Sequence, residues 1–284
     1  MNNARIIKIS TQMKILRPQK IPTVLSIGGF DNIGGAGIQA DLKTTSELGC
    51  HGMNVLTALP IQNSLAVRSI YPISSSLVKM QLDTVLEDIY PDVIKIGMLH
   101  SVANIKVVAE VLKDYSGDIV IDPVLKSTSG TKLYRGNFKA ALRDRLFPLA
   151  SLITPNIPEV YDLIGQTVSD AESMYEAGIE LLRSGAGAIL IKGGHLKSNT
   201  MFSSLVTADR QAMIYNNTRI ETKNTRGTGC TLATAIACYL AMGKPLNLAF
   251  PLAMDYVASR IRASVTANLG KGNGCLAPSA KKRH

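Results

Sequence analysis

The segment DVIKIGMLHSVANIKVVAEVLKDYSGDIVIDPVL, residues 92–125, places one helical stretch between two short apolar runs. The runs 92–99 and 118–125 are rich in Val and Ile, which predicts buried β-strands. Residues 104–115 have the length and the spacing of apolar residues that are typical of an α-helix. Two strands joined in this way by a helix lie parallel in one sheet, so the segment predicts an α/β fold.

The same alternation continues on both sides of this segment. Further strands are predicted at 23–29, 53–59, 151–156 and 188–194, and further helices at 36–49, 76–89, 171–186, 229–242 and 246–267. Two apolar runs around Asp209 and Arg210 are typical of a hairpin. Because the other strands are apolar almost throughout, we expect a mostly parallel central sheet that is covered by helices on both faces.

The chain is expected to form one domain. No repeat, low-complexity segment or linker interrupts it, and the predicted domain covers residues 21–275, followed by a C-terminal tail at 276–284. Residues 1–20 carry basic side chains and no acid. We expect a disordered tail there, or a start at Met13; a transit peptide is the alternative.

Charge and composition argue against nucleic acid and membrane as partners. The net charge of +10 comes mainly from the two ends, and the part between residue 20 and the final KKRH has a net charge near +2. The chain has no Trp and no apolar run of the roughly 20 residues that cross a bilayer. Its four cysteines form no C-x-x-C pair, which predicts free thiols and a cytoplasmic location.

Polar clusters follow the predicted strands, at the edge where ligands bind in parallel sheets. These clusters are GGFD (28–31) with GGAG (34–37), QN (62–63), KIGML (95–99), DPV (122–124), TPNIPE (154–159), KGGH (192–195) and TRGTGC (225–230). A Walker P-loop is absent, and GGAG does not complete the dinucleotide fingerprint. Taken alone, GGAG favours tight packing of a strand against a helix over a ligand cradle.

Gly227 and Gly229 stand with Cys230 at the start of a predicted helix. Glycines allow close approach of the backbone to a ligand, and the first helical turn offers free N–H groups to an anion. The same field would lower the pKa of the Cys230 thiol, to somewhere in the range of ~3.5–7.5. The pattern therefore indicates a phosphoryl-transfer site with a thiol beside it, while a buried structural cysteine stays the alternative.

Other candidates allow two interpretations each. Asn156 and Glu159 are spaced to support Mg²⁺ through water, or to form a capping box. Lys192 suits a phosphate, or reaches solvent from a strand end, and His195 is interpreted as structural or surface. Asp41 and Gln62 could hold a small heterocycle, or lie at the surface.

Seven collinear motifs resemble those of the hydroxymethylpyrimidine/phosphomethylpyrimidine kinases. They are GGAGIQADLKT (34–44), TALPIQN (57–63), KIGML (95–99), DPV…SG (122–130), LITPNIPE (152–159), KGGH (192–195) and TKNTRGTGCT (222–231). The resemblance covers about 22–274 and implies a ribokinase-like three-layer αβα sandwich and a homodimer. It also implies phosphorylation of 4-amino-5-hydroxymethyl-2-methylpyrimidine, and then of its monophosphate, by ATP and Mg²⁺ in thiamine diphosphate biosynthesis.

The resemblance implies a role for each matching residue. The pyrimidine site would consist of Gly29, Asp41, Gln62, Met98, Val124 and Cys230. The phosphates and their metal would be bound by Lys192, Asn156, Glu159, Gly227, Thr228 and Gly229, with Mg²⁺ on Asn156 and Glu159 through water. Lys192, Gly227 and Gly229, together with Cys230, would be the catalytic set.

The chain departs from the family pattern in three places: Phe30 with Asn32-Ile33, Leu125-Lys126-Ser127, and Arg226 where the family usually has His. Arg226 would place a permanent cation near the phosphate path, and Phe30 and Ile33 would reshape the pyrimidine entrance. A pyridoxal kinase and a nonenzymatic pyrimidine-binding regulator are therefore alternatives. Gln62-Asn63 and KGGH favour the pyrimidine kinase.

Overall fold

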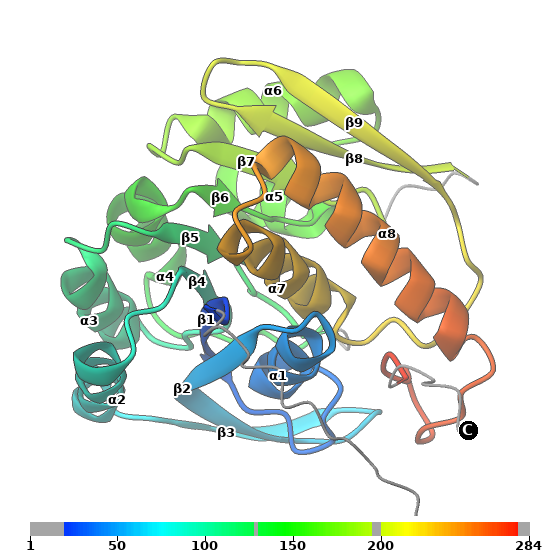
Figure 1. The fold of residues 1–284 in the computed structure, drawn as a ribbon. Coiled ribbons are helices and arrows are strands. Elements are labelled where there is room, and N and C mark those ends of the chain that lie inside the picture. The colour runs from blue at the N-terminus through cyan, green and yellow to red at the C-terminus, as the bar shows by residue number, and fades with distance from the viewer. Residues whose placement is uncertain (1–19, 128–129, 195–199, 278–284) are drawn as a thin grey trace, which may run out of the picture.

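A computed structural model describes residues 20–127, 130–194 and 200–277, and nine strands within them form one sheet (Figure 1). The strands are β1 (Thr23–Gly29), β2 (His51–Gln62), β3 (Val67–Pro72), β4 (Val93–Ile96), β5 (Asp118–Ile121), β6 (Leu152–Ile153), β7 (Ala188–Ile191), β8 (Thr200–Thr207) and β9 (Ala212–Thr218). Their order in the sheet is β3-β2-β1-β4-β5-β6-β7-β8-β9. Most of the predicted tails, 1–19 and 278–284, lie outside the described residues.

The middle of the sheet is parallel, as predicted. The six strands from β2 through β1, β4, β5 and β6 to β7 pair in parallel. The predicted hairpin is confirmed as β8 and β9, which extend the sheet in antiparallel pairing. The sequence pattern does not predict β3, an antiparallel edge strand whose side chains are largely exposed. Because neither face of β3 is buried, it lacks the alternation that marks a strand.

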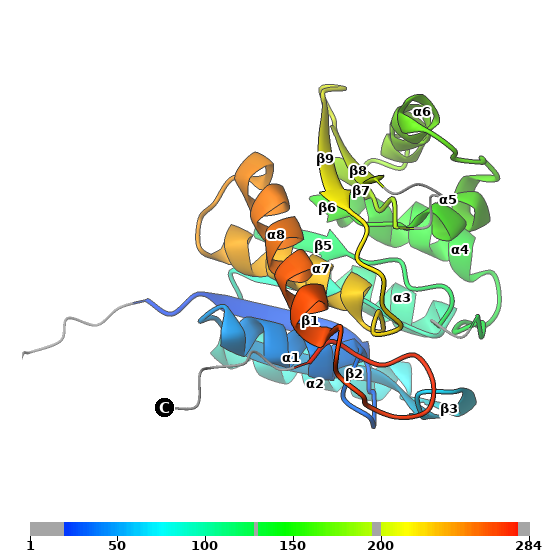
Figure 2. The same ribbon diagram turned by 90° about the vertical axis from the view of Figure 1, so that its right-hand side faces the viewer.

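Helices cover both faces of the sheet. They are α1 (Gly37–Glu47), α2 (Ser75–Asp88), α3 (Val102–Leu112), α4 (Phe138–Ala141), α5 (Ile157–Ile164), α6 (Ala171–Leu182), α7 (Thr228–Ala241) and α8 (Leu246–Ser264). Figure 2 shows α7 and α8 on one side of the sheet and α3, α5 and α6 on the other. The predicted three-layer αβα sandwich is therefore confirmed.

Neighbouring residues of each central strand supply two separate hydrophobic cores. Val24 and Val93 pack with α7 and α8, whereas the adjacent Leu25 and Ile94 pack with α2, α3 and α6. Side chains of a strand alternate between the two faces, so a strand buried on both sides is apolar at every position. Among the described residues, no helix has the length and apolar character needed to span a bilayer.

A buried ion pair connects the sheet to the helices beneath the loops. Lys95 of β4 donates from Nζ to both carboxylate oxygens of Asp41 in α1, each at 3.0 Å. Thr234 of α7 donates to the same carboxylate at 2.7 Å. Burial by itself favours the neutral amine, but Asp41, together with weaker contributions from Cys230 and Asp122, raises the pKa of Lys95 above its usual value. The pair is therefore charged and joins three elements from distant parts of the chain.

We expect Lys95→Met to lower the free energy of unfolding by about 3–5 kcal/mol, because it leaves the Asp41 carboxylate buried without its cation. Lys79→Met is the matched control, since Lys79 forms an exposed i,i+4 pair with Asp83 and should cost less than about 1 kcal/mol. Urea unfolding of the three proteins measures both effects. Equal losses in the two variants would contradict the structural role of Lys95.

Candidate active site

A cavity of about 650 Å³ lies at the carboxyl ends of the parallel strands. All seven polar clusters predicted from the sequence contribute to its wall. Their contributions include Gly29, Gln62, Met98, Asp122, Glu159, Lys192 and Cys230. The prediction that segments far apart in the sequence converge on one cleft is confirmed.

Two glycine-containing loops meet at the floor of this cavity. Gly227 has φ +81°, and a Cβ on it would overlap the carbonyl oxygen of Gly35. Gly37 has φ +56°, and a Cβ there would overlap the carbonyl oxygen of Gly29. Each position requires a residue without a side chain. The GGAG segment therefore serves close packing of the chain, as predicted from that motif alone.

The start of α7 lies beside a partly buried lysine, Lys192. Lys192 Nζ contacts Asp122 Oδ1 at 2.7 Å and lies 3.9 Å from Glu159 Oε2. Burial alone would favour the neutral amine, but the two carboxylates raise the pKa of Lys192, so it is a cation. A Cβ on Gly229 would lie 3.4 Å from this ammonium, which places the lysine beside the first turn of α7. The two together form an anion-binding corner.

Cys230 lies in that first turn, partly exposed to the cavity. Although part of its side chain faces the cavity, desolvation raises the pKa of the thiol to about 11. Asp41 and Asp122 act in the same direction, and Lys95 only partly opposes them. The prediction that the start of the helix lowers this pKa is therefore wrong, because the surrounding carboxylates and the loss of water outweigh the helix.

Asn156 and Glu159 form the capping box at the start of α5. The Glu159 N–H donates to Asn156 Oδ1 at 2.8 Å, and the Asn156 N–H donates to Glu159 Oε2 at 2.8 Å. Both residues also line the cavity. Burial raises the pKa of Glu159 to about 7, although Lys192 opposes this shift. The two interpretations of this pair are thus compatible, since a capping carboxylate also faces the site.

The opposite side of the cavity is mostly apolar, with one amide. Gly29, Met98 and Val124 line it, and Gln62 closes its edge. A Cβ on Gly29 would come within 2.9 Å of Met98 Sδ, so the glycine leaves room for that side chain. Asp41, predicted to bind the pyrimidine, has no exposed surface, and its oxygens are held by Lys95 and Thr234. Asp41 and Lys95 nevertheless both contribute to the lining of the cavity.

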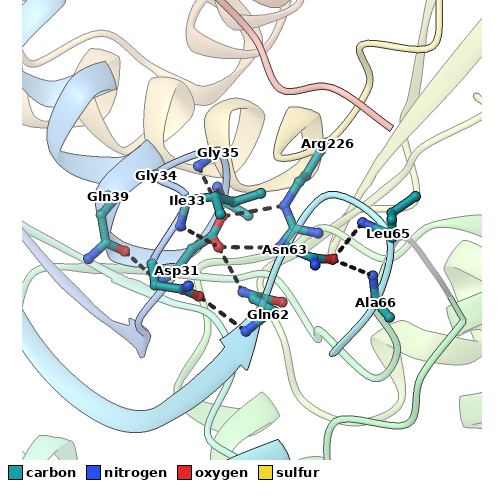
Figure 3. A network of polar contacts seen from close by, with 12 residues as sticks. Asp31, Ile33, Gly34, Gly35, Gln39, Gln62, Asn63, Leu65, Ala66 and Arg226 are labelled. Atoms are coloured by element: carbon teal, nitrogen blue, oxygen red, sulfur yellow. Dashed lines mark hydrogen bonds and ion pairs between the residues drawn. The ribbon is translucent and has the colours of Figure 1, made fainter. Parts of the chain in front are cut away.

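Arg226 does not extend toward the phosphate side, contrary to expectation. Its guanidinium pairs with Asp31, with Nη2 at 3.3 Å from Oδ1 and Nε at 3.4 Å from Oδ2, and both residues are buried. Figure 3 shows this contact and the hydrogen bond from Gln62 to the same carboxylate. Phe30 lines the cavity, as its place in the sequence suggests, whereas the exposed Ile33 does not contribute to the lining.

The remaining predicted residues also have a place in the structure. Thr228 lines the cavity, and its hydroxyl donates to the carbonyl oxygen of Thr225 at 3.0 Å. His195, the last residue of the KGGH motif, lies outside the described residues. In the described part of the chain, no cluster of three or more His, Cys, Asp or Glu side chains is arranged to hold a metal ion.

The fold and the cavity define a ribokinase-like kinase of small molecules. Residues 31–277 match the model of the phosphomethylpyrimidine kinase family. The chain is 44% identical to the thiamine biosynthesis bifunctional protein ThiED of Geobacter sulfurreducens over 93% of its own length, and it spans 54% of that relative. It is 40% identical to the hydroxymethylpyrimidine/phosphomethylpyrimidine kinase of Rhizobium meliloti, covering 88% of this chain and 94% of the relative.

One similar solved structure is a pyridoxal kinase with a bound nucleotide. The ADP complex of the Staphylococcus aureus enzyme has a TM-score of 0.84 and 30% sequence identity, and covers 93% of this chain and 96% of that chain. Fold similarity thus extends to both kinds of vitamin kinase, whereas sequence identity is higher to the pyrimidine kinases. The chain belongs to the phosphomethylpyrimidine kinase family, and it is an ATP-using kinase.

The raised pKa of Cys230 predicts slow alkylation. At pH 7 we expect iodoacetamide to modify this thiol more than about 100-fold more slowly than free cysteine, because only the thiolate reacts. The rate should rise about tenfold per pH unit between pH 7 and 10. Mass spectrometry of peptides separates Cys230 from the buried Cys50, Cys238 and Cys275. A fast rate that is constant between pH 6 and 8 would show a lowered pKa instead.

Proposed function

We propose that the protein transfers the terminal phosphate of ATP to the hydroxymethyl group of 4-amino-5-hydroxymethyl-2-methylpyrimidine, and then phosphorylates the monophosphate to the diphosphate, in thiamine diphosphate biosynthesis. The observation that carries the proposal is the layout of one cavity. The same cavity is lined by the apolar Met98 and Val124 with the amide of Gln62, and by Lys192 with the start of α7, which form the anion-binding corner. Cys230 stands between the two halves.

The anion-binding corner suits the charge that develops during phosphoryl transfer. The Thr228 N–H donates to the Thr225 carbonyl oxygen, but the Gly229 and Cys230 N–H groups lie in the first turn of α7 without partners in their own helix, so they can donate to phosphate oxygens. Lys192 adds a positive charge whose carboxylate partners fix its position. Since the transition state is loose and its charge spreads over three oxygens, positioned donors supply most of the catalysis.

Cys230 acts in this proposal as an orienting group. With a pKa of about 11 the thiol is neutral at physiological pH, so it is not a ready base. A thiol sulfur can still accept a hydrogen bond from a substrate hydroxyl and hold its oxygen in line with the phosphate. Phosphoryl transfer through a loose transition state needs little removal of the proton before the bond forms.

Mg²⁺ fits the corner next to Glu159. Burial and Asp122 raise the pKa of Glu159 even though Lys192 lies 3.9 Å away, so a further positive charge would stabilise its ionised form. A dication bound with the nucleotide would supply that charge and neutralise the phosphates. Asn156 and Glu159 would hold it through water, since each already forms a hydrogen bond of the capping box.

Pyridoxal is the second candidate substrate, and the solved pyridoxal kinases of the same fold favour it. The higher sequence identity to the pyrimidine kinases and the amide of Gln62 at the apolar wall favour the pyrimidine.

The four free cysteines support a reducing location, the cytoplasm. The resemblance to the family supports a homodimer.

Product analysis tests the proposed substrate. We expect incubation with ATP, Mg²⁺ and the hydroxymethylpyrimidine to yield first the monophosphate and then the diphosphate, both resolved by chromatography. Pyridoxal in the same assay should react at least about tenfold more slowly, because an apolar pocket with one fitted amide discriminates by its hydrogen bond. ADP release with pyridoxal alone would identify a pyridoxal kinase, and ligand binding without ADP release would identify a nonenzymatic regulator.

Substitution of Cys230 tests its orienting role. Cys230→Ala should lower kcat by about 10²-fold or more, because the acceptor hydroxyl loses its positioning partner. Cys230→Ser should stay within about tenfold of the wild type, since a hydroxyl also accepts a hydrogen bond. Steady-state kinetics at saturating ATP measure both variants. Full activity of Cys230→Ala would show that the thiol contributes only to packing.

A further inference from the structure

Asp31 is the centre of a saturated polar network between the cavity and the C-terminal part of the chain (Figure 3). Its Oδ2 accepts from the backbone N–H groups of Gly35 at 2.9 Å and Ala36 at 2.8 Å. Its Oδ1 accepts from Gln62 Nε2 at 2.9 Å, and Arg226 contacts both oxygens. A carboxylate has about four acceptor positions, so this one is fully occupied.

The hydrogen bond to Asp31 determines the orientation of the Gln62 amide. An ionised carboxylate only accepts hydrogen bonds, so the amide nitrogen of Gln62 must face it and the amide oxygen must face away. Among the described residues, none donates a hydrogen bond to Gln62 Oε1. Gln62 is 9% exposed and lines the cavity. The oxygen is therefore the acceptor that Gln62 offers to a ligand.

Arg226 pairs with Asp31 and holds its carboxylate in place. Asp31 is 1% exposed and Arg226 is 5% exposed, so neither charge is solvated by bulk water. The aliphatic part of Arg226 packs against the Gly35 loop, and its backbone N–H donates to the Gly274 carbonyl oxygen at 3.0 Å. A buried ion pair of this kind contributes more to position than to stability.

We propose that Arg226 is a positioning residue that determines substrate specificity through Asp31 and Gln62. Arg226 holds the carboxylate of Asp31, and this carboxylate accepts a hydrogen bond from the amide nitrogen of Gln62. The amide oxygen of Gln62 then faces the ring of the substrate. The site then selects a heterocycle with an N–H donor, such as an exocyclic amine, over one with a carbonyl oxygen at the same position. This inference rests on the proposed function, because the amine belongs to the proposed pyrimidine.

The test compares the aminopyrimidine alcohol with its 4-oxo analogue, which carries an acceptor where the amine was. For the wild type, we expect kcat/KM to favour the amine by about 10²-fold or more, since the oxo group would leave the amide oxygen unpaired. Arg226→Met should raise KM for the amine at least about tenfold and reduce this preference at least about tenfold. KM for ATP should change less than about twofold.

Three further variants make the result interpretable. Arg260→Met is the matched control, because the buried Arg260 forms a partly exposed ion pair with Glu47 that does not line the cavity, so this change should leave the preference unchanged. Asp31→Asn replaces the acceptor with a group that can also donate, so Gln62 can turn and the preference should fall. Arg226→Lys keeps the charge and should retain more of the preference than Arg226→Met. These two also provide the test if Arg226→Met does not fold.

Calorimetric titration of both alcohols without ATP separates the inference from the proposed function. Selective binding of the amine by the wild type, weakened in Arg226→Met, supports the inference even if the second phosphorylation does not occur. Equal amine binding and an unchanged preference in Arg226→Met and Asp31→Asn would overturn it while the kinase function stands. Failure of the wild type to bind either alcohol would overturn both.

Discussion

The whole site depends on the close approach of two loops that contain glycine. Gly227 lies directly against the Gly35 carbonyl oxygen, where no side chain fits. This contact joins the loop after β1 to the loop before α7, which are almost 200 residues apart in the chain. It sets the start of α7 next to the end of β1, and thereby places Cys230 and the anion-binding corner beside the apolar wall. A wider separation would divide the cavity into two unrelated surfaces.

Buried charge is arranged in pairs around this contact. Lys95 with Asp41, and Lys192 with Asp122, each place an ammonium and a carboxylate below or beside the cavity. In each pair the carboxylate balances the charge of the ammonium and fixes its position. Loss of water is the main reason for the raised pKa of the Cys230 thiol, and Asp41 and Asp122 add to it because they oppose a further negative charge close by.

The sequence predicted the elements that carry a strong periodic signal. The central strands and both C-terminal helices follow from apolar runs and their spacing, and the common edge of the site follows from parallel pairing. The helical segment that begins at Phe138 was not predicted, although Phe138, Leu142 and Leu146 are spaced four residues apart. By contrast, the exposed edge strand β3 offers no pattern, and only its pairing with β2 defines it.

Properties set by neighbours in space were beyond prediction from the sequence. The pKa of Cys230 depends on carboxylates from α1 and the loop after β5, and a motif at one helix start cannot report them. The pairing of Arg226 with Asp31 joins residues 195 positions apart, so neither residue alone indicates the contact. Arg226 has Asp31 as its partner because the two loops lie in contact. The motif identified a cation, and the fold pairs that cation with Asp31, which also accepts a hydrogen bond from the Gln62 amide.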